Sequence, residues 1–111
     1  MSETLRILKD ARKLLSAKSR WVQGQYWADK KGRRATKSTA TCFCLVGSLH
    51  KVGDYQAVKP AYAALMDNLK RLSNRVVPPL RYWNDRNDTD HKDVLNLMDV
   101  TIEQLETTEG R

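Results

Sequence analysis

Two cysteines and two histidines are the side chains of this 111-residue sequence that could supply a nucleophile, a base or a zinc ligand. A thiol enzyme needs a cysteine nucleophile, a histidine base and a polar group that orients the base. Cys44 is the candidate nucleophile, and its candidate partners are His50, His91, Asn84 and Asp85. A cysteine inside an apolar helical stripe is far more often a small buried hydrophobe, and neither histidine has a spacing that requires it to lie near Cys44. We therefore expect no catalytic residue, and the sequence favours a protein that is not an enzyme.

The spacing of Cys42 and Cys44 also argues against zinc. Paired zinc-binding cysteines are usually separated by two to four residues, whereas a single residue separates these two. Closing a disulfide across so short a loop strains its geometry. We expect two reduced thiols.

A second set of candidate ligands lies between residues 85 and 93, where four aspartates surround His91: Asp85, Asp88, Asp90 and Asp93. A calcium loop needs Gly at its sixth position and Glu at its twelfth, and counting from Asp85 these positions hold Asp90 and Asn96. Acidic residues at a helix start also cap free N–H groups and interact favourably with the helix dipole. The pattern predicts a helix start, with neither a metal nor another cofactor.

The strongest indication of a partner is a cluster of five cations within residues 30–37, namely Lys30, Lys31, Arg33, Arg34 and Lys37. The cluster follows Trp21, Tyr26 and Trp27, and a basic loop beside aromatic side chains can neutralise phosphates and stack on bases. Arg6, Lys9 and Lys13 share the polar face of a predicted first helix and would extend the cluster. The alternative is a solvated turn and an ordinary charged helix face, since no helix-turn-helix, RNP strand or zinc-finger spacing is present.

The charge is distributed unevenly along the chain. The formal net charge of +7 comes from 20 Lys and Arg residues against 13 Asp and Glu residues. Residues 1–51 hold 12 of these cations and 3 of the acidic residues, whereas residues 52–111 hold 8 and 10. Any surface that binds a polyanion is therefore expected in the first half.

A third hypothesis is a shallow polar pocket that binds a small ligand. Its predicted lining is Trp21, Gln23, Trp83, Asn84, Asp85 and His91. Convergent polar groups define such a site. The structural interpretation of the same segment is a buried Trp83, with Asn84 and Asp85 bonded to the backbone of a turn.

Apolar residues with helical spacing predict the elements that must position these side chains. The spacing predicts a first helix from an N-cap at Ser2 to about Ala17, and a second along Cys42, Leu45, Leu49 and Val52, capped by Thr39 or Thr41 and ended by Gly53. It predicts a third helix that begins near Pro60 and a fourth along Leu95, Met98, Ile102 and Leu105, which opens at Asp88, Thr89 or Asp90.

The segments between these helices have other signatures. Aromatic and β-branched residues over 21–28, followed by a turn with Gly32, predict a short hairpin. The Thr-rich run that follows, up to Thr41, is either the return strand of this hairpin or plain loop. Residues 76–79, Val-Val-Pro-Pro, predict an extended connector into Trp83. The expected fold is a single α+β domain over residues 1–111, mainly helical, with about four helices and a small hairpin between the first and second.

Composition excludes several classes of protein. With 41% hydrophobic and 30% charged residues the chain is neither disordered nor membrane-like by composition. Its longest apolar run, residues 42–46, is far shorter than the ~20 residues of a membrane span. Charges interrupt the apolar residues of the N-terminus, so we expect no secretory signal, no membrane partner and a cytoplasmic protein of a bacterium or phage.

Four motifs resemble those of a known family. They are W-V-Q-G at 21–24, C-L-V-G-S-L at 44–49, W-N-D at 83–85 and V-L-N-L-M-D-V-T-I at 94–102. Together they resemble a family of small bacterial and phage proteins described as a domain of unknown function, with W-T-Q-G, C-L-L-G-A-L, W-N-D and V-L-x-L-L-D-x-A-I in the same order. Val22, Ser48 and Thr101 depart tolerably from that pattern. The resemblance implies no activity or cofactor, and because the loop after Tyr26 is more basic here, it implies no nucleic-acid binding either.

Three functions thus remain open. The first is a small basic binding module that contacts nucleic acid, a nucleoprotein or an acidic protein surface through residues 30–37 and the first helix. The second is a phage or mobile-element interaction or inhibitor protein with an apolar epitope on the third or fourth helix. The third is a ligand-binding domain or enzyme around Gln23, Cys44, Asn84, Asp85 and His91.

Overall fold

A computed structural model describes residues 2–73 and 75–109, which form five α-helices, one short 3-10 helix and a two-stranded sheet. The elements in chain order are α1 (Glu3–Leu14), η1 (Lys18–Arg20), β1 (Trp27–Ala28), β2 (Cys42–Phe43), α2 (Leu45–Val52), α3 (Tyr55–Leu72), α4 (Leu80–Asn84) and α5 (His91–Glu109). The α+β class, the helical majority and the place of the hairpin between the first two helices are as predicted. Four of the helices are long, and the fifth, α4, has five residues.

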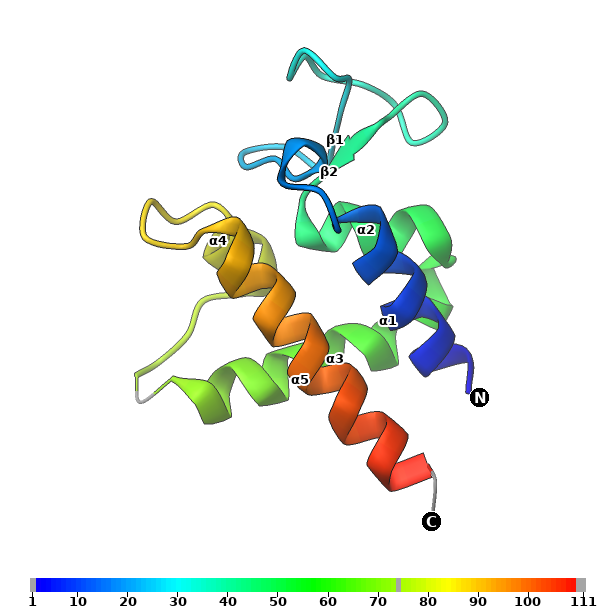
Figure 1. The fold of residues 1–111 in the computed structure, drawn as a ribbon, viewed down its shortest axis with the longest axis vertical. Helices are drawn as coiled ribbons and strands as arrows, with labels where there is room; N and C mark the ends of the chain where they lie inside the picture. The colour runs from blue at the N-terminus through cyan, green and yellow to red at the C-terminus, as the bar shows by residue number, and fades with distance from the viewer. Residues whose placement is uncertain (1, 74, 110–111) are drawn as a thin grey trace.

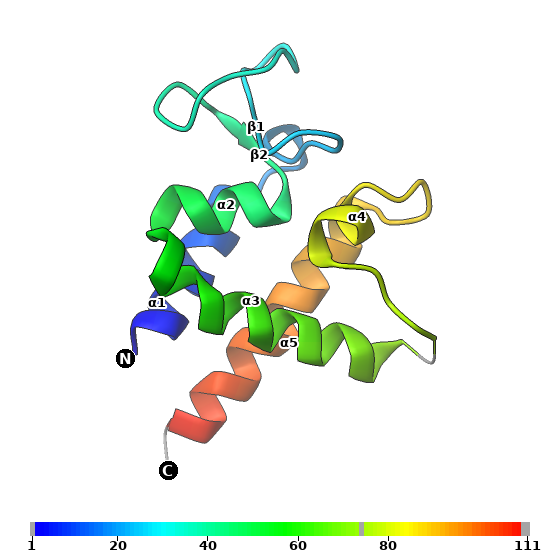
Figure 2. The same ribbon diagram turned by 180° about the vertical axis from the view of Figure 1, so that it is seen from behind.

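The helices form a body with the hairpin at one end (Figure 1). Helix α1 packs against α2, α3 and α5, and α3 also packs against α5 (Figures 1 and 2). One apolar cluster joins these elements, and its fully buried members include Leu8, Leu45, Leu65 and Leu97. Burial of such apolar side chains from every long helix makes the main favourable contribution to the stability of the fold.

Helix α1 begins as predicted, since the Ser2 side chain accepts a hydrogen bond from the Leu5 backbone N–H. It ends at Leu14, earlier than the predicted Ala17. The Ser16 hydroxyl donates to the Arg12 and Lys13 carbonyls, at 3.2 and 2.9 Å, and so satisfies groups that a longer helix would have bonded.

The start of α2 was predicted wrongly. The N-cap is Cys44, whose sulfur accepts from the Gly47 N–H at 3.2 Å, and neither Thr39 nor Thr41 caps this helix. Cys42 lies in β2 rather than on the helix. The predicted end at Gly53 is confirmed.

Helix α3 begins earlier than predicted, at Tyr55, because the Asp54 carboxylate caps the Ala57 N–H at 2.8 Å. Pro60 therefore lies inside the helix and not in its first turn. The Val58 N–H still donates to the Asp54 carbonyl, so the helix is established before the proline interrupts its hydrogen bonding.

Helix α4 replaces the last part of the predicted extended connector. It starts directly after Pro79, and its first residue, Leu80, is fully buried in the core. Helix α5 begins as expected after Asp90. The Asp90 carboxylate accepts from the Asp93 N–H at 2.9 Å, and the Asp93 carboxylate accepts from the Asp90 N–H at 3.0 Å.

The hairpin pairs β1 and β2 antiparallel, with Trp27 opposite Phe43 and Ala28 opposite Cys42. The return strand follows the Thr-rich run instead of being formed by it. Residues 29–41 make a loop that projects beyond the helical body (Figure 1). No helix of residues 2–73 and 75–109 has the length and apolarity to cross a membrane.

The first and last described residues are bonded to each other. The Ser2 backbone N–H and hydroxyl donate to the Glu109 carboxylate at 3.1 and 2.7 Å. This contact lies at the end of the molecule opposite the hairpin (Figure 1).

Candidate functional site

Asn84 forms the centre of a buried hydrogen-bond network that joins three segments of the chain. Its side chain is fully buried. Its Oδ1 accepts from Trp21 Nε1 at 2.7 Å and from the Leu45 N–H at 3.1 Å, and its Nδ2 donates to the Val22 carbonyl at 3.1 Å and to Asp85 Oδ1 at 2.9 Å. The amide thus makes all four of the hydrogen bonds available to it. The network connects the segment before β1, the start of α2 and the end of α4.

Gln23 adds a second set of contacts to the same region. Its Nε2 lies within hydrogen-bond distance of three backbone carbonyls after α4, those of Asn84, Arg86 and Thr89, at 2.8, 3.0 and 3.3 Å. The Gly24 N–H donates to Asp85 Oδ1 at 2.8 Å. The W-V-Q-G and W-N-D motifs are therefore bonded to each other, and they attach the hairpin to the helical body.

The structure brings together five of the six residues predicted to line a polar pocket. His91 is buried, with its Nε2 2.6 Å from the Leu15 carbonyl oxygen and its ring centroid 6.1 Å from that of Trp21. Trp83 lies apart and lines a groove with Leu69 and Leu72. Polar atoms of the other residues bond to one another or to backbone, so their arrangement holds the fold together.

The two thiols are free and buried. Burial raises the pKa of Cys44 to about 11, and its sulfur is occupied by the Gly47 N–H. Cys42 donates to the Ser19 carbonyl at 3.4 Å. Both thiols contact backbone groups, and a thiol with the pKa of Cys44 is protonated at neutral pH.

The aspartates of residues 85–93 also have internal partners. Asp88 pairs with Arg86 at 2.8 Å, and the hydrogen bond from that guanidinium lowers the pKa of the Asp88 carboxyl. The Asp93 N–H lowers the pKa of Asp90 in the same way at the start of α5. Within the described ranges no three His, Cys, Asp or Glu side chains come together as a metal site.

The predicted cations of α1 are largely paired with carboxylates. Arg6 contacts Glu3 and Asp10 at 3.0 and 2.9 Å, and Lys9 contacts Glu106 at 2.9 Å. These pairs connect neighbouring turns of α1 or join α1 to α5. They reduce the positive potential of this helix, so Arg6 and Lys9 offer less to an acidic partner than their sequence suggests. Lys13, in the last turn of α1, is exposed.

The basic loop is built around Asp29. Its Oδ1 accepts from the Lys31 and Arg33 N–H groups, both at 2.9 Å, and its Oδ2 accepts from Arg33 Nε at 3.1 Å. The backbone hydrogen bond from Arg33 is the main cause of a lowered Asp29 pKa. Gly32 completes the turn with a φ of 81°, which favours glycine. The turn leaves Lys30 and Lys31 exposed.

Exposed cations from two segments form a surface that we call the basic end. The 3-10 helix joins the hairpin because the Ser19 carbonyl accepts from Cys42 in β2. Between residues 17 and 41 the one acidic residue is Asp29. The basic end consists of Lys18, Arg20, Lys30, Lys31, Arg33, Arg34 and Lys37.

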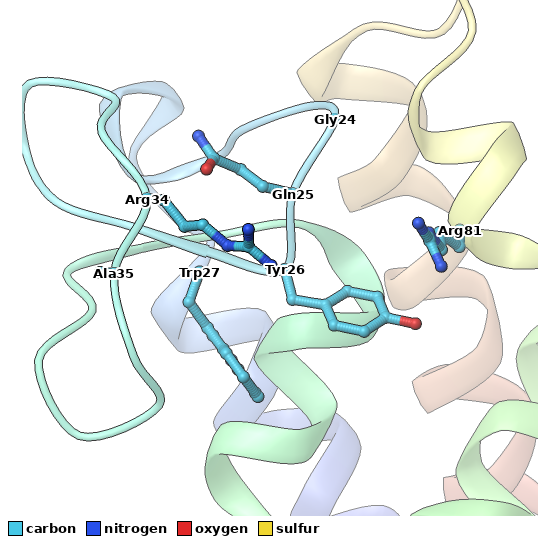
Figure 3. A pocket seen from close by; sticks show the side chains of 7 residues that line it. All are labelled: Gly24, Gln25, Tyr26, Trp27, Arg34, Ala35 and Arg81. Atoms are coloured by element: carbon cyan, nitrogen blue, oxygen red, sulfur yellow. The ribbon is translucent and has the colours of Figure 1, made fainter.

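A hollow of about 510 Å³ opens beside the basic end, between the hairpin and α4 (Figure 3). Figure 3 shows Arg34 entering from the loop and Arg81 from α4, with the Tyr26 side chain extending toward α4. The lining is Gly24, Gln25, Tyr26, Trp27, Arg34, Ala35 and Arg81. The lining thus combines two guanidiniums and two aromatic rings with no carboxylate.

The rings of Tyr26 and Tyr82 hold Arg81 in place. Its guanidinium carbon lies 5.2 Å from the Tyr26 ring centroid and 5.6 Å from that of Tyr82. These distances are typical of cation–π contacts. Among the described ion pairs, none involves Arg81 or Arg34.

A smaller, more apolar hollow of about 350 Å³ shares Tyr26 with the first. In it His50 stacks on Tyr55, with ring centroids 6.1 Å apart, and the Lys59 ammonium lies 5.0 Å from the Tyr55 centroid. Burial, with a smaller effect of Lys37, lowers the pKa of His50. Aromatic rings and cations therefore continue beyond the first hollow.

Sequence reasoning identified Arg34, Tyr26 and Trp27 but missed Arg81 and Gln25. Arg81 lies far along the chain, in a segment expected to be extended, and only the formation of α4 places it beside the hairpin. Its position three residues before Asn84 was the available signal, because Asn84 anchors the hairpin.

Comparison with known proteins gives one match. No curated protein and no solved structure is similar to the chain. The model of a family described as a family of unknown function, DUF6197, matches residues 1–104. Nearly the whole chain is covered, and the protein therefore belongs to the family DUF6197.

Proposed function

We propose that the protein is a binding module that contacts nucleic acid through its basic end. The observation that carries the proposal is the separation of its cations into two groups. Most of those on α1 form ion pairs, such as Arg6 with Asp10, whereas Lys30, Lys31 and Arg34 are exposed on a loop with a single carboxylate. Exposed cations of this kind bind polyanions by releasing the counterions of the phosphates.

The adjoining aromatic rings favour nucleic acid over an acidic protein surface. Tyr26 and Trp27 lie in the hollow beside Arg34. Aromatic rings beside a cationic surface are typical of sites that bind unpaired bases, because every base has a face that can stack. Acidic side chains would engage the cations but have no ring with which to stack on aromatic side chains.

The test compares two double variants with the same change in net charge, from +7 to +3. Lys30→Glu with Lys31→Glu reverses two charges in the basic end, and Lys70→Glu with Arg75→Glu reverses two exposed charges on α3 and the connector after it. Binding of a labelled oligonucleotide is measured by fluorescence anisotropy at several salt concentrations. We expect the affinity of the loop variant to fall more than about tenfold and that of the control variant to fall much less.

The salt dependence provides a second measure of the same contacts. The slope of log Kd against log salt concentration should decrease by about 1 to 2 in the loop variant. Equal losses in both variants would show attraction by net charge alone and contradict a defined surface. Absence of binding to single- and double-stranded nucleic acid at low salt would refute the proposal.

A second candidate is a protein-interaction surface at the end of α3. Leu72 is 56% exposed, and Val76 is fully exposed in the following connector. Trp83 lines the adjoining groove of about 450 Å³. Capture of a host protein that resists nuclease, is lost in Leu72→Ser with Val76→Ser and is retained in the loop variant would favour this function.

A further inference from the structure

We infer that the hollow between the hairpin and α4 is a seat for one nucleotide with an unstacked base, with its phosphate on Arg34 and Arg81. The inference rests on the proposed function and narrows it to single-stranded nucleic acid. It follows from the lining, which offers two guanidiniums and two aromatic rings (Figure 3). Guanidiniums bind a phosphate, and aromatic rings stack on a base.

Arg81 is placed to bind a phosphate before any ligand arrives. Its contacts at 5.2 and 5.6 Å to the rings of Tyr26 and Tyr82 hold the face of the guanidinium. A stacked guanidinium keeps its N–H groups available at the edge, and two of them fit a phosphate in a bidentate arrangement. Because the described ion pairs leave out Arg81, a phosphate does not have to displace a carboxylate.

Arg34 differs from the lysines at the tip of the loop because its backbone is bound to the sheet. It forms a bridge with Ala28, and the next residue, Ala35, donates its N–H to the Trp27 carbonyl at 3.1 Å. These contacts fix the point from which the Arg34 side chain enters the hollow (Figure 3). The two arginines therefore approach from separate segments with hydrogen-bonded backbones, which favours a defined phosphate position over diffuse attraction.

The volume and the aromatic lining of the hollow favour an unpaired nucleotide. Its volume of about 510 Å³ is in the range of small-ligand sites. Tyr26 and Trp27 pack edge to face, with centroids 5.8 Å apart, and provide an aromatic wall. The bases of a duplex are paired and stacked on one another, so they cannot enter without being unstacked, which costs free energy.

The experiment measures binding of a 12-nucleotide single strand and of the matching duplex to three proteins: the unaltered chain, Arg81→Gln and Arg75→Gln. Arg75 is an exposed arginine in the connector after α3, where it lines a different groove, so its variant controls for loss of one charge. We expect the single strand to bind at least about tenfold more tightly than the duplex. We also expect Arg81→Gln to lower the affinity for the single strand about tenfold, while Arg75→Gln changes this affinity less than about twofold.

A second titration tests whether a free nucleotide also binds in the hollow. A nucleoside 5′-monophosphate is added while the Trp27 indole resonance is followed by NMR. A saturable shift that Arg81→Gln abolishes supports the seat with a free nucleotide as its ligand. Duplex binding as tight as single-strand binding, or equal losses in the two variants, overturns the seat while leaving the proposed function in place. If no oligonucleotide binds at low salt, the proposed function fails, and the mononucleotide titration alone decides whether the seat exists.

Circular dichroism separates loss of the site from loss of the fold. The Arg81 side chain is exposed, so Arg81→Gln is expected to keep the melting temperature of the unaltered chain. If it unfolds, Arg34→Gln provides the second variant, since Arg34 is an exposed loop residue on the other side of the hollow. Full affinity in a folded Arg34→Gln would then overturn the inference.

Discussion

Asn84 is the side chain that couples the hairpin to the helical body. It is fully buried and bonds to two segments distant in sequence, at residues 21–22 and at Leu45. Burying an amide costs free energy unless its donors and acceptors are hydrogen-bonded. Removing the amide leaves its buried partner groups with no hydrogen bond to water or protein. The polar residues that suggested a ligand pocket act here as internal connections.

Asn84→Ala is therefore expected to lower the free energy of unfolding by about 3 kcal/mol, because it leaves the Trp21 indole and the Leu45 N–H unsatisfied. Urea denaturation followed by tryptophan fluorescence measures the change. Asn96→Ala, at an exposed position of α5, is the control and should change stability by less than about 0.5 kcal/mol. Equal stability of Asn84→Ala and the unaltered protein would show that the network contributes little.

The thiols permit a prediction of reactivity. Burial raises the pKa of Cys44 from 9.0 to about 11, so the thiolate fraction near neutral pH decreases about 100-fold. Alkylation of Cys44 by iodoacetamide at pH 8 should be at least about 100-fold slower in the native protein than in denaturant, and should accelerate as the pH rises toward 11. Peptide mass spectrometry measures each cysteine separately. Rapid native labelling of Cys44 would reopen the thiol-enzyme hypothesis.

At the scale of elements, the sequence predicted the long helices better than their ends. Apolar residues with helical spacing have a period that the sequence reveals. Most of these side chains are buried or half-buried, although Leu72 at the end of α3 is exposed. The ends depended on caps that are weaker signals, such as the sulfur of Cys44 and the carboxylate of Asp54. The five residues of α4 are too few to show a period, and burial of Leu80 decides that helix.

The candidate site was predicted in part for the same reason. Local composition identified the basic loop and its aromatic neighbours. The pairing of Lys9 with Glu106, like the approach of Arg81 to Tyr26, joins residues far apart in the chain. No local pattern contains such contacts, so the charge of α1 was overestimated and Arg81, on the α4 side of the hollow, was missed.

Gly47 shows how the packing of α2 on the hairpin constrains one position. A Cβ there would collide with the Tyr26 backbone carbonyl, which cannot move aside as a flexible side chain could. Helix propensity predicts that Gly47→Ala stabilises α2 by up to about 1 kcal/mol, whereas the collision predicts the opposite sign. We expect a loss of about 3 kcal/mol in chemical denaturation.

Gly32→Ala is the matched comparison for this prediction. Gly32 has a φ of 81° but open space around its Cα, so the expected loss is the backbone strain alone, about 1 kcal/mol. A smaller loss for Gly47→Ala than for Gly32→Ala would mean that α2 moves away from the hairpin at little cost.

At the scale of the whole molecule, the cations of the basic end repel one another and destabilise the folded chain. Five of its seven cations lie within residues 30–37, directly after its one carboxylate, and like charges in proximity destabilise the compact state. The surface that we propose for binding is therefore expected to reduce stability in the free protein. Salt screens such exposed charges over about 10 Å at 0.1 M.

The Lys30→Glu and Lys31→Glu double variant should consequently be more stable than the unaltered chain at low salt, by about 0.5 kcal/mol. The difference should vanish in about 0.5 M NaCl, where the repulsion is screened. Thermal denaturation at the two salt concentrations measures it. A variant that is less stable at low salt would indicate that these lysines have attractive partners.

The contact between Ser2 and Glu109 has a practical consequence. Both ends of the described chain lie opposite the hairpin (Figure 1). A protein tethered to a solid support by either end therefore turns its loop, and the hollow beside the loop, toward the solution. Affinities measured with the two orientations of attachment should then agree. Fusion partners at either end would likewise leave the same face open.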